Sequence, residues 1–212
     1  MNLTSDLTVL KHALIRRAII LRELVNSFSP PLDKPADRLV TYVAIEALNT
    51  WASFARAYYL SCCVRRARRE NGARVTLTGG TIATSLDALF WACRVVRGAK
   101  RPPTDRRQEP AWHDPNTLLR TFAVLNPSNL GEMQAAFSFS TNVFDHLPTI
   151  RNFFAHRNDE TMLKVRNVAR NLAINPSQRA CEIVCSTVTG RPQNILTDWL
   201  DDLSAVATLL CA

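Results

Sequence analysis

The sequence predicts an all-α protein, folded as a single helical bundle over residues 1–212. Apolar residues recur at three- and four-residue steps through most of the chain, which is the spacing of one helix face. Only 6 residues are glycine, which disfavours a turn-rich all-β protein, and 47% of the residues are hydrophobic. The chain is therefore long and apolar enough to bury one sizeable core.

The first part of the chain carries two strong helix patterns. Residues 7–28 form an amphipathic pattern that the proline pair at 30–31 ends. A second helix is expected to begin near Asp33 and to run to about Glu70, where Asn71-Gly72 ends it. Its apolar face follows helical spacing over Val40, Val43, Ala47, Trp51, Phe54 and Tyr58.

The middle of the chain combines two shorter helices with a long basic connection. Thr84 and Asp87 have the spacing of a capping box, which opens a helix that reaches Val96. Residues 98–115 hold four prolines among several Lys and Arg, so we expect a long Pro-rich loop that is either a functional flap or mobile. A short helix is expected over 116–125.

The C-terminal part is expected to hold three more helices. A polar, aromatic-rich stretch leads into Pro148, which is expected to begin the first of them. The others are expected over 159–173 and 193–211, with irregular or weakly extended chain over 176–191.

The charge of the chain is strongly positive. Its formal net charge is +8, and 22 of its 26 basic residues are arginine. A basic surface favours a polyanionic partner, nucleic acid first and an anionic membrane second. An arginine-rich composition also arises from a GC-rich genome, so the charge alone does not decide the partner.

The cysteines and the N-terminus indicate a cytoplasmic protein. The six cysteines form neither the Cys-x-x-Cys pairs of zinc sites nor the framework of a secreted disulfide protein, so we expect reduced thiols and no metal or cofactor. Arg16, Arg17 and Arg22 interrupt the first apolar pattern, unlike a signal peptide, and no apolar run reaches membrane-spanning length. We expect no membrane partner.

The stretch Arg-Asn-Phe-Phe-Ala-His at residues 151–156 carries the clearest chemistry. If it is helical, Asn152 and His156 stack on one face while Ile150 and Phe154 anchor the opposite side. Arg151 then points roughly a quarter turn away from the Asn/His face. Either its long side chain swings towards that face, or a working site needs a bent helix or a second subunit.

These three side chains suit the cleavage of RNA. His156 can move a proton near neutral pH, and Arg151 can stabilise the charge that grows on the phosphoryl oxygens. Asn152 can orient the imidazole or bind the phosphate. The candidate catalytic residues are therefore Arg151, Asn152 and His156, with no metal required.

Three further residues are candidates for substrate binding. Arg157 extends the positive surface beside the histidine, and Glu46 and Asn49 lie on the polar side of the second helix, where they can face a cleft or be simply solvated. The Arg-to-His spacing alone is weak, because it arises about 0.4 times by chance in so arginine-rich a chain. The context of the motif therefore carries more weight than its spacing.

That context resembles the Arg-x(4–6)-His signature of the HEPN superfamily, here Arg151-Asn152-x-x-x-His156. The expected helix around residues 45–54 is similar to a helix of the RiboL-PSP-associated HEPN domains, which form one branch of that superfamily. The resemblance covers roughly residues 37–173, so that helix 7–28 and residues 174–212 elaborate a shared core. In one toxin branch, a tyrosine two residues after the histidine is adenylylated, and this modification inactivates the toxin. Asn158 occupies that position here, so we do not expect control by adenylylation.

The resemblance implies a HEPN-like helical bundle and a metal-independent endoribonuclease. Family members commonly form homodimers with the active site at the interface, and leave 2′,3′-cyclic phosphate and 5′-hydroxyl ends. Many are toxins paired with a cognate antitoxin, or effectors of antiviral abortive infection. The alternatives are a catalytically silent HEPN-type module that binds RNA or a protein, and a helical scaffold whose arginines are compositional.

Overall fold

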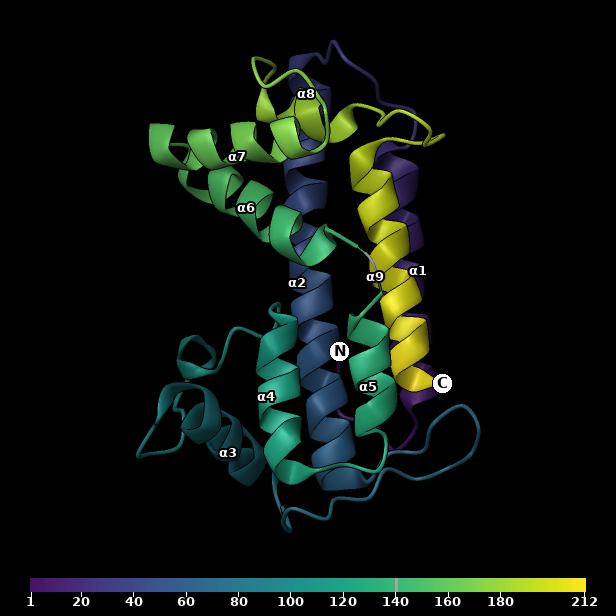
Figure 1. Ribbon diagram of the computed structural model, residues 1–212, viewed down its shortest axis with the longest axis vertical. Coiled ribbons are helices and arrows are strands. Elements are labelled where there is room, and N and C mark those ends of the chain that lie inside the picture. The colour runs from purple at the N-terminus through teal and green to yellow at the C-terminus, as the bar shows by residue number, and fades with distance from the viewer. Residues whose placement is uncertain (140) are drawn as a thin grey trace. The chain divides into compact units, whose positions relative to one another are not determined.

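The structure is a computed structural model that describes residues 1–139 and 141–212. In that part of the chain the regular structure is helical apart from isolated β-bridges, which confirms the predicted all-α class. Figure 1 shows the order of the helices. They are α1 Leu7–Val25, α2 Lys34–Arg65, α3 Ser85–Arg97, α4 Pro115–Leu125, α5 Leu130–Phe137, α6 Val143–His156, α7 Asp159–Asn171, α8 Ala180–Cys185 and α9 Ile195–Cys211.

The chain groups into two compact units. Unit 1 comprises Met1–Ile15, Trp51–Ser140 and Ala205–Ala212, and unit 2 comprises Arg16–Thr50 and Thr141–Ser204. Helices α1, α2 and α9 each contribute one part to each unit. The motif at residues 151–156 lies in unit 2.

Unit 1 contains the long basic connection between α3 and α4. The predicted capping box opens α3, because the Thr84 and Asp87 side chains each accept a hydrogen bond from the other residue's backbone N–H. The connection contains a short 3₁₀ helix, Arg106–Gln108. The buried carboxylate of Glu109 accepts two hydrogen bonds from Arg56, at 2.6 and 2.8 Å, and one from the Trp112 indole at 2.8 Å. Residues 98–115 are therefore tied to α2 near their middle.

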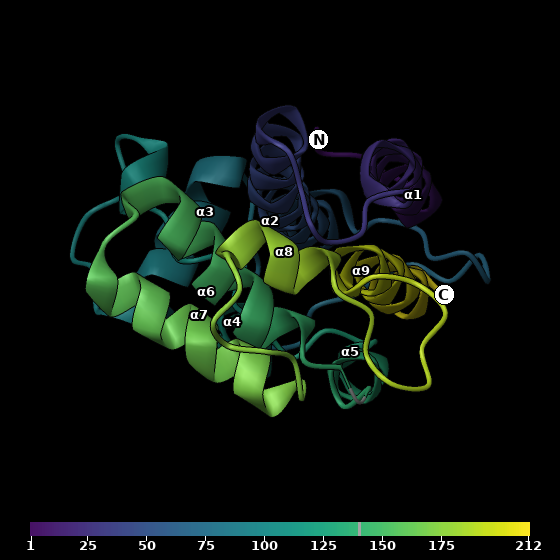
Figure 2. The ribbon, with the colours of Figure 1, turned by 90° about the horizontal axis from the view of Figure 1, so that it is seen from above.

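In unit 2, α6 and α7 lie side by side, and α8 lies near the start of α2 (Figures 1 and 2). An ion pair of 3.4 Å joins Arg179, just before α8, to Asp37 of α2. The first three residues of the predicted apolar face of α2, Val40, Val43 and Ala47, are buried here. In unit 2, α2 therefore packs into the core through the apolar face that the sequence predicts.

The expected end of the second helix is wrong by five residues. α2 ends at Arg65 rather than near Glu70. Arg66 adopts a left-handed φ of 47°, and the N–H of Ala67 donates back to the carbonyl of Ser61 at 3.2 Å. The chain leaves the helix through this turn before it reaches Asn71-Gly72.

Pro148 does not begin a helix, contrary to expectation. α6 starts at Val143, so Pro148 lies inside it and lacks the N–H that would donate to the carbonyl of Phe144. Burial of Val143, Leu147 and Ile150 offsets that loss. Two helices were also missed: α5, in the polar, aromatic-rich stretch before Pro148, and the short α8 within 176–191, which was expected to be irregular or weakly extended.

Candidate functional site

The C-terminal half of α6 holds the three candidate catalytic residues. The helix is continuous from Val143 to His156, so Arg151, Asn152 and His156 all have helical backbone, as predicted. Two apolar side chains anchor this half in the core: Ile150 is 0% exposed and Phe154 is 6% exposed. The position of the motif on the protein is therefore fixed by packing.

Helical geometry separates the three side chains into two directions. At about 100° per residue, Asn152 and His156 lie one turn apart on the side of α6 that faces away from Ile150. Arg151 lies about 100° from Asn152 and about 140° from His156 on the same basis. One chain thus brings Asn152 and His156 together and leaves Arg151 on a neighbouring side of the helix.

The side chains of Arg151, Asn152 and His156 are accessible and have no bonding partner among the described residues. His156 is exposed, and Arg151 and Asn152 are half-buried. None of them makes a side-chain hydrogen bond or an ion pair with any residue in the part of the chain that the structure describes. Groups without protein partners are free to meet a ligand, although no described residue holds the His156 ring in one orientation.

Arg157 ends α6 in a strained conformation. It adopts a left-handed φ of 46°, and its N–H donates to the carbonyl of Phe153 at 2.7 Å. Glycine is usual at this position because a side chain is disfavoured there. Asn158 then caps α7 by accepting a hydrogen bond from the N–H of Thr161 at 2.8 Å. The backbone of Arg157 is therefore fixed at the sharp turn beside His156.

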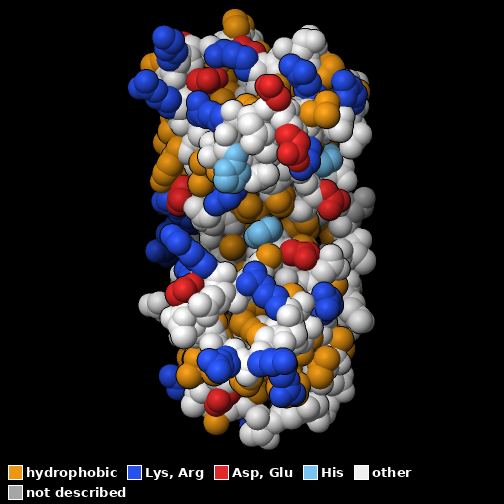
Figure 3. Space-filling view, turned by 90° about the vertical axis from the view of Figure 1, so that its left-hand side faces the viewer, with side chains coloured by type: hydrophobic (Ala, Val, Ile, Leu, Met, Phe, Trp, Pro, Cys, Tyr) orange, Lys and Arg blue, Asp and Glu red, His pale blue; other side chains and the backbone are white. Residues whose placement is uncertain are grey.

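A hollow of about 250 Å³ lies next to this turn. Phe153, Phe154 and Met162 make it mainly apolar, and Arg157 and Arg179 bring positive charge to it. Cys181 also lines it, but burial raises the pKa of this thiol to about 12, so it is neutral and a poor nucleophile. Figure 3 shows Lys, Arg and His side chains, with Asp and Glu between them, on the side to which the C-terminal end of α6 and the start of α7 point.

Glu46 and Asn49 lie away from the hollow. The Glu46 carboxylate accepts hydrogen bonds from Arg17 of α1 at 3.1 Å and from Asn49 at 3.2 Å. Glu46 follows Asp37, which lines the hollow, by nine residues, so it lies about 180° around α2 from it. The structure therefore places Arg157 at the motif and directs Glu46 and Asn49 towards α1.

Sequence reasoning missed two residues at this site. Phe153 was given no role, yet it is half-buried and lines the hollow. Arg179 lies 22 residues beyond Arg157 and no local pattern connects them; the ion pair with Asp37 places it there. The one local signal for Phe153 was its position on a helical wheel, about 100° from both Asn152 and Phe154.

The chain matches no family model, and no curated protein or solved structure is significantly similar to it. Among the described residues, no group of three or more His, Cys, Asp and Glu side chains could hold a metal ion. A membrane crossing would need a longer or more apolar helix than any in the described part of the chain.

Proposed function

We propose that this chain is an endoribonuclease that cleaves RNA at the C-terminal end of α6. His156 transfers the proton, Arg151 clamps the phosphate, and Asn152 orients the imidazole or the phosphate. The proposal is the HEPN-like interpretation of the motif, and it includes cleavage without a metal ion. It also includes a role as a toxin or antiviral effector in the cytoplasm, restrained by an antitoxin.

The pairing of Asn152 and His156 carries this proposal. Both side chains lie one turn apart on a helix that Ile150 and Phe154 hold in place, and both lack partners among the described residues. Arg157 and the mainly apolar hollow beside it supply a cation for phosphate and a surface for a base.

The reaction needs only proton transfer and charge stabilisation. A histidine takes the proton of the 2′-hydroxyl, and the resulting oxygen attacks the adjacent phosphorus. The bond from phosphorus to the 5′-oxygen breaks, and that oxygen receives a proton. The products are a 2′,3′-cyclic phosphate and a 5′-hydroxyl, and the negative charge on the phosphoryl oxygens is stabilised by a guanidinium.

The proposed active form is a homodimer. Because Arg151 and His156 point about 140° apart on one helix, one chain does not direct both at the same phosphate. Two copies that meet at the ends of α6 bring the arginine of one to the histidine of the other. The two histidines then supply the base and the acid of the reaction.

The second candidate function is a module that binds RNA without cleaving it. The observation that favours it is the absence of a partner for His156 among the described residues. A general base is normally oriented by a hydrogen bond from a third group. Without a second copy, the same cationic surface binds RNA and leaves it intact.

The deciding experiment is a cleavage assay on labelled RNA in excess EDTA. We expect the wild-type chain to cleave RNA to 2′,3′-cyclic phosphate ends and to leave the same strand uncleaved when it is fully 2′-O-methylated. We expect His156→Ala to lose activity by about 10²–10⁴-fold. His12→Ala is the matched control, because His12 is also exposed but lies in unit 1.

The outcomes separate the candidates. Undiminished cleavage by His156→Ala overturns the assignment of His156, and RNA binding without cleavage by the wild-type chain favours the silent module. Expression in cells tests the toxin role, since only the active chain should arrest growth. Sedimentation of the wild-type chain tests the dimer, and a monomer that cleaves RNA would contradict it.

A further inference from the structure

A second pocket in unit 2 lies at the other end of α6. It has a volume of about 330 Å³, at the lower end of the range for small-molecule sites. Asn142 lies at the start of α6, Leu172 follows α7, and Ile195, Asp198 and Trp199 belong to the start of α9. Three separate parts of the chain therefore converge on one cavity that the RNA-cleavage proposal does not use.

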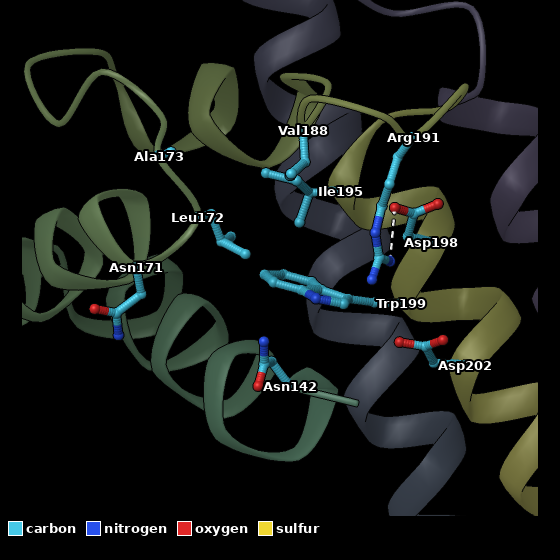
Figure 4. A pocket seen from close by; sticks show the side chains of 10 residues that line it. All are labelled: Asn142, Asn171, Leu172, Ala173, Val188, Arg191, Ile195, Asp198, Trp199 and Asp202. Carbon is cyan, nitrogen blue, oxygen red and sulfur yellow. Dashed lines mark hydrogen bonds and ion pairs between the residues drawn. The ribbon is translucent and has the colours of Figure 1, made fainter. Parts of the chain in front are cut away.

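The pocket has an apolar side and a charged side. In Figure 4 the indole of Trp199 lies in the middle, with Leu172 near one end and Arg191, Asp198 and Asp202 near the other. Trp199 is only 3% exposed, so its ring is fixed by the core rather than free to move. The cavity thus presents a rigid aromatic surface beside charged groups.

The carboxylates that line the pocket differ in their partners. Asp198 is buried and forms an ion pair of 3.0 Å with Arg191. Asp202 accepts a hydrogen bond of 2.5 Å from the Thr141 hydroxyl, and it forms no ion pair within the described residues. Burial raises the pKa of Asp202, the hydrogen bond from Thr141 and the charge of Arg191 lower it, and the nearby Asp198 and Asp201 raise it further.

The unpaired carboxylate decides the charge of a suitable ligand. Asp198 and Arg191 cancel one another, so Asp202 leaves the charged lining with one net negative charge. An anion such as a phosphate would meet uncompensated repulsion there. A cation would gain both the carboxylate and the face of the indole, which attracts positive charge.

We propose that this pocket binds a small organic cation, a molecule with an ammonium or guanidinium group on an apolar body. The charged group pairs with Asp202 and lies against Trp199, and the apolar body contacts Leu172 and Ile195. Asn142, whose amide has no side-chain partner among the described residues, is placed to bond a polar substituent. This proposal does not depend on the cleavage of RNA.

Three probes of similar size test the proposal by calorimetry on the full chain. Phenethylammonium is the cation, 2-phenylethanol is the neutral analogue and 3-phenylpropionate is the anion. We expect the cation to bind about tenfold tighter than the neutral probe, and the anion not to bind. Equal affinities, or no binding of the cation with a Kd of ~1 mM or tighter, would overturn the proposal.

Two neighbouring acids give a matched pair of variants. Asp202→Asn keeps an acceptor for Thr141 but removes the charge, and we expect it to weaken binding of the cation about tenfold. Asp201→Asn is the control, because Asp201 is bonded to Arg22 at 3.2 Å and Gln193 at 2.8 Å and does not line the pocket. Circular dichroism confirms that each variant is folded. Equal binding by both variants would contradict the role of Asp202.

Discussion

Polar side chains at the two ends of α6 differ in their burial and in their bonding partners. At its C-terminal end, Asn152 and His156 are accessible and have no partner among the described residues. At its start, His146 is buried with its ring 6.0 Å from that of Trp199, and Thr141 is hydrogen-bonded to Asp202. His146 and Thr141 are therefore packed or bonded within the fold, whereas Asn152 and His156 are free for a ligand. Substitutions at the two ends should differ accordingly.

The largest expected effect is on the free energy of unfolding, which should depend on whether the buried or the accessible face of α6 is changed. Ile150→Ala should lower the free energy of unfolding by about 2–5 kcal/mol, because it empties a fully buried site. His156→Ala should change it by no more than about 0.5 kcal/mol, as expected for an exposed side chain. Urea unfolding followed by circular dichroism measures both. A large loss of stability in His156→Ala would show that this end also supports the fold.

The strained turn at the end of α6 gives the next effect. Arg157→Gly should raise the free energy of unfolding by about 1 kcal/mol, because glycine adopts a positive φ without steric cost. It should also weaken RNA binding and lower the salt slope of log K by about 1, since one phosphate contact is lost.

Arg66→Gly is the matched control for that variant. Arg66 has a φ of 47°, so the same relief of strain and the same loss of charge occur in unit 1, which does not contain the motif. Affinity for RNA, measured by fluorescence anisotropy at several salt concentrations, should fall much more for Arg157→Gly. Equal losses would mean that Arg157 contributes only to the net charge.

The buried histidine at the start of α6 should make stability depend on pH. Burial lowers the pKa of His146, although the nearby Asp145 opposes this. The unfolded chain therefore binds this proton more readily, so stability holds above pH ~6.5 and falls as the pH decreases towards the lowered pKa of the folded state. Thermal unfolding from pH 7 to pH 5 should show this decline, and His146→Phe should reduce it. If stability declined equally in His146→Phe, other titratable groups would be responsible for the pH dependence.

The smallest effect concerns Asp202. Because burial raises its pKa in the folded state, its ionisation at neutral pH opposes folding. Asp202→Asn should therefore stabilise the protein at pH 7, and the gain should vanish below pH ~3.9, where the carboxyl is protonated in both states. Urea unfolding at the two pH values checks the sign. A loss of stability at pH 7 would show that the carboxylate is compensated in the fold.

The local signals in the sequence were sufficient for most helices. Thr84 and Asp87 predicted the start of α3, and the apolar spacing along α2 predicted its buried face. The same reasoning misplaced the start of α6, because Pro148 is an effective helix signal only where packing does not compensate for its missing N–H. It also left Glu46 either at a cleft or solvated, whereas the structure pairs Glu46 with Arg17 on another helix.

The sequence by itself determined the all-α class, the apolar faces and the helical frame that puts Asn152 and His156 on one side of α6. These features depend on residues within a few positions of one another, so periodicity and capping specify them. Only the tertiary structure decided that Arg179 joins Arg157 at one hollow, and that Asn142, Leu172 and Trp199 share a pocket. Those groupings depend on contacts between residues far apart in the chain, such as Asp37 with Arg179 and Thr141 with Asp202, which no local pattern encodes.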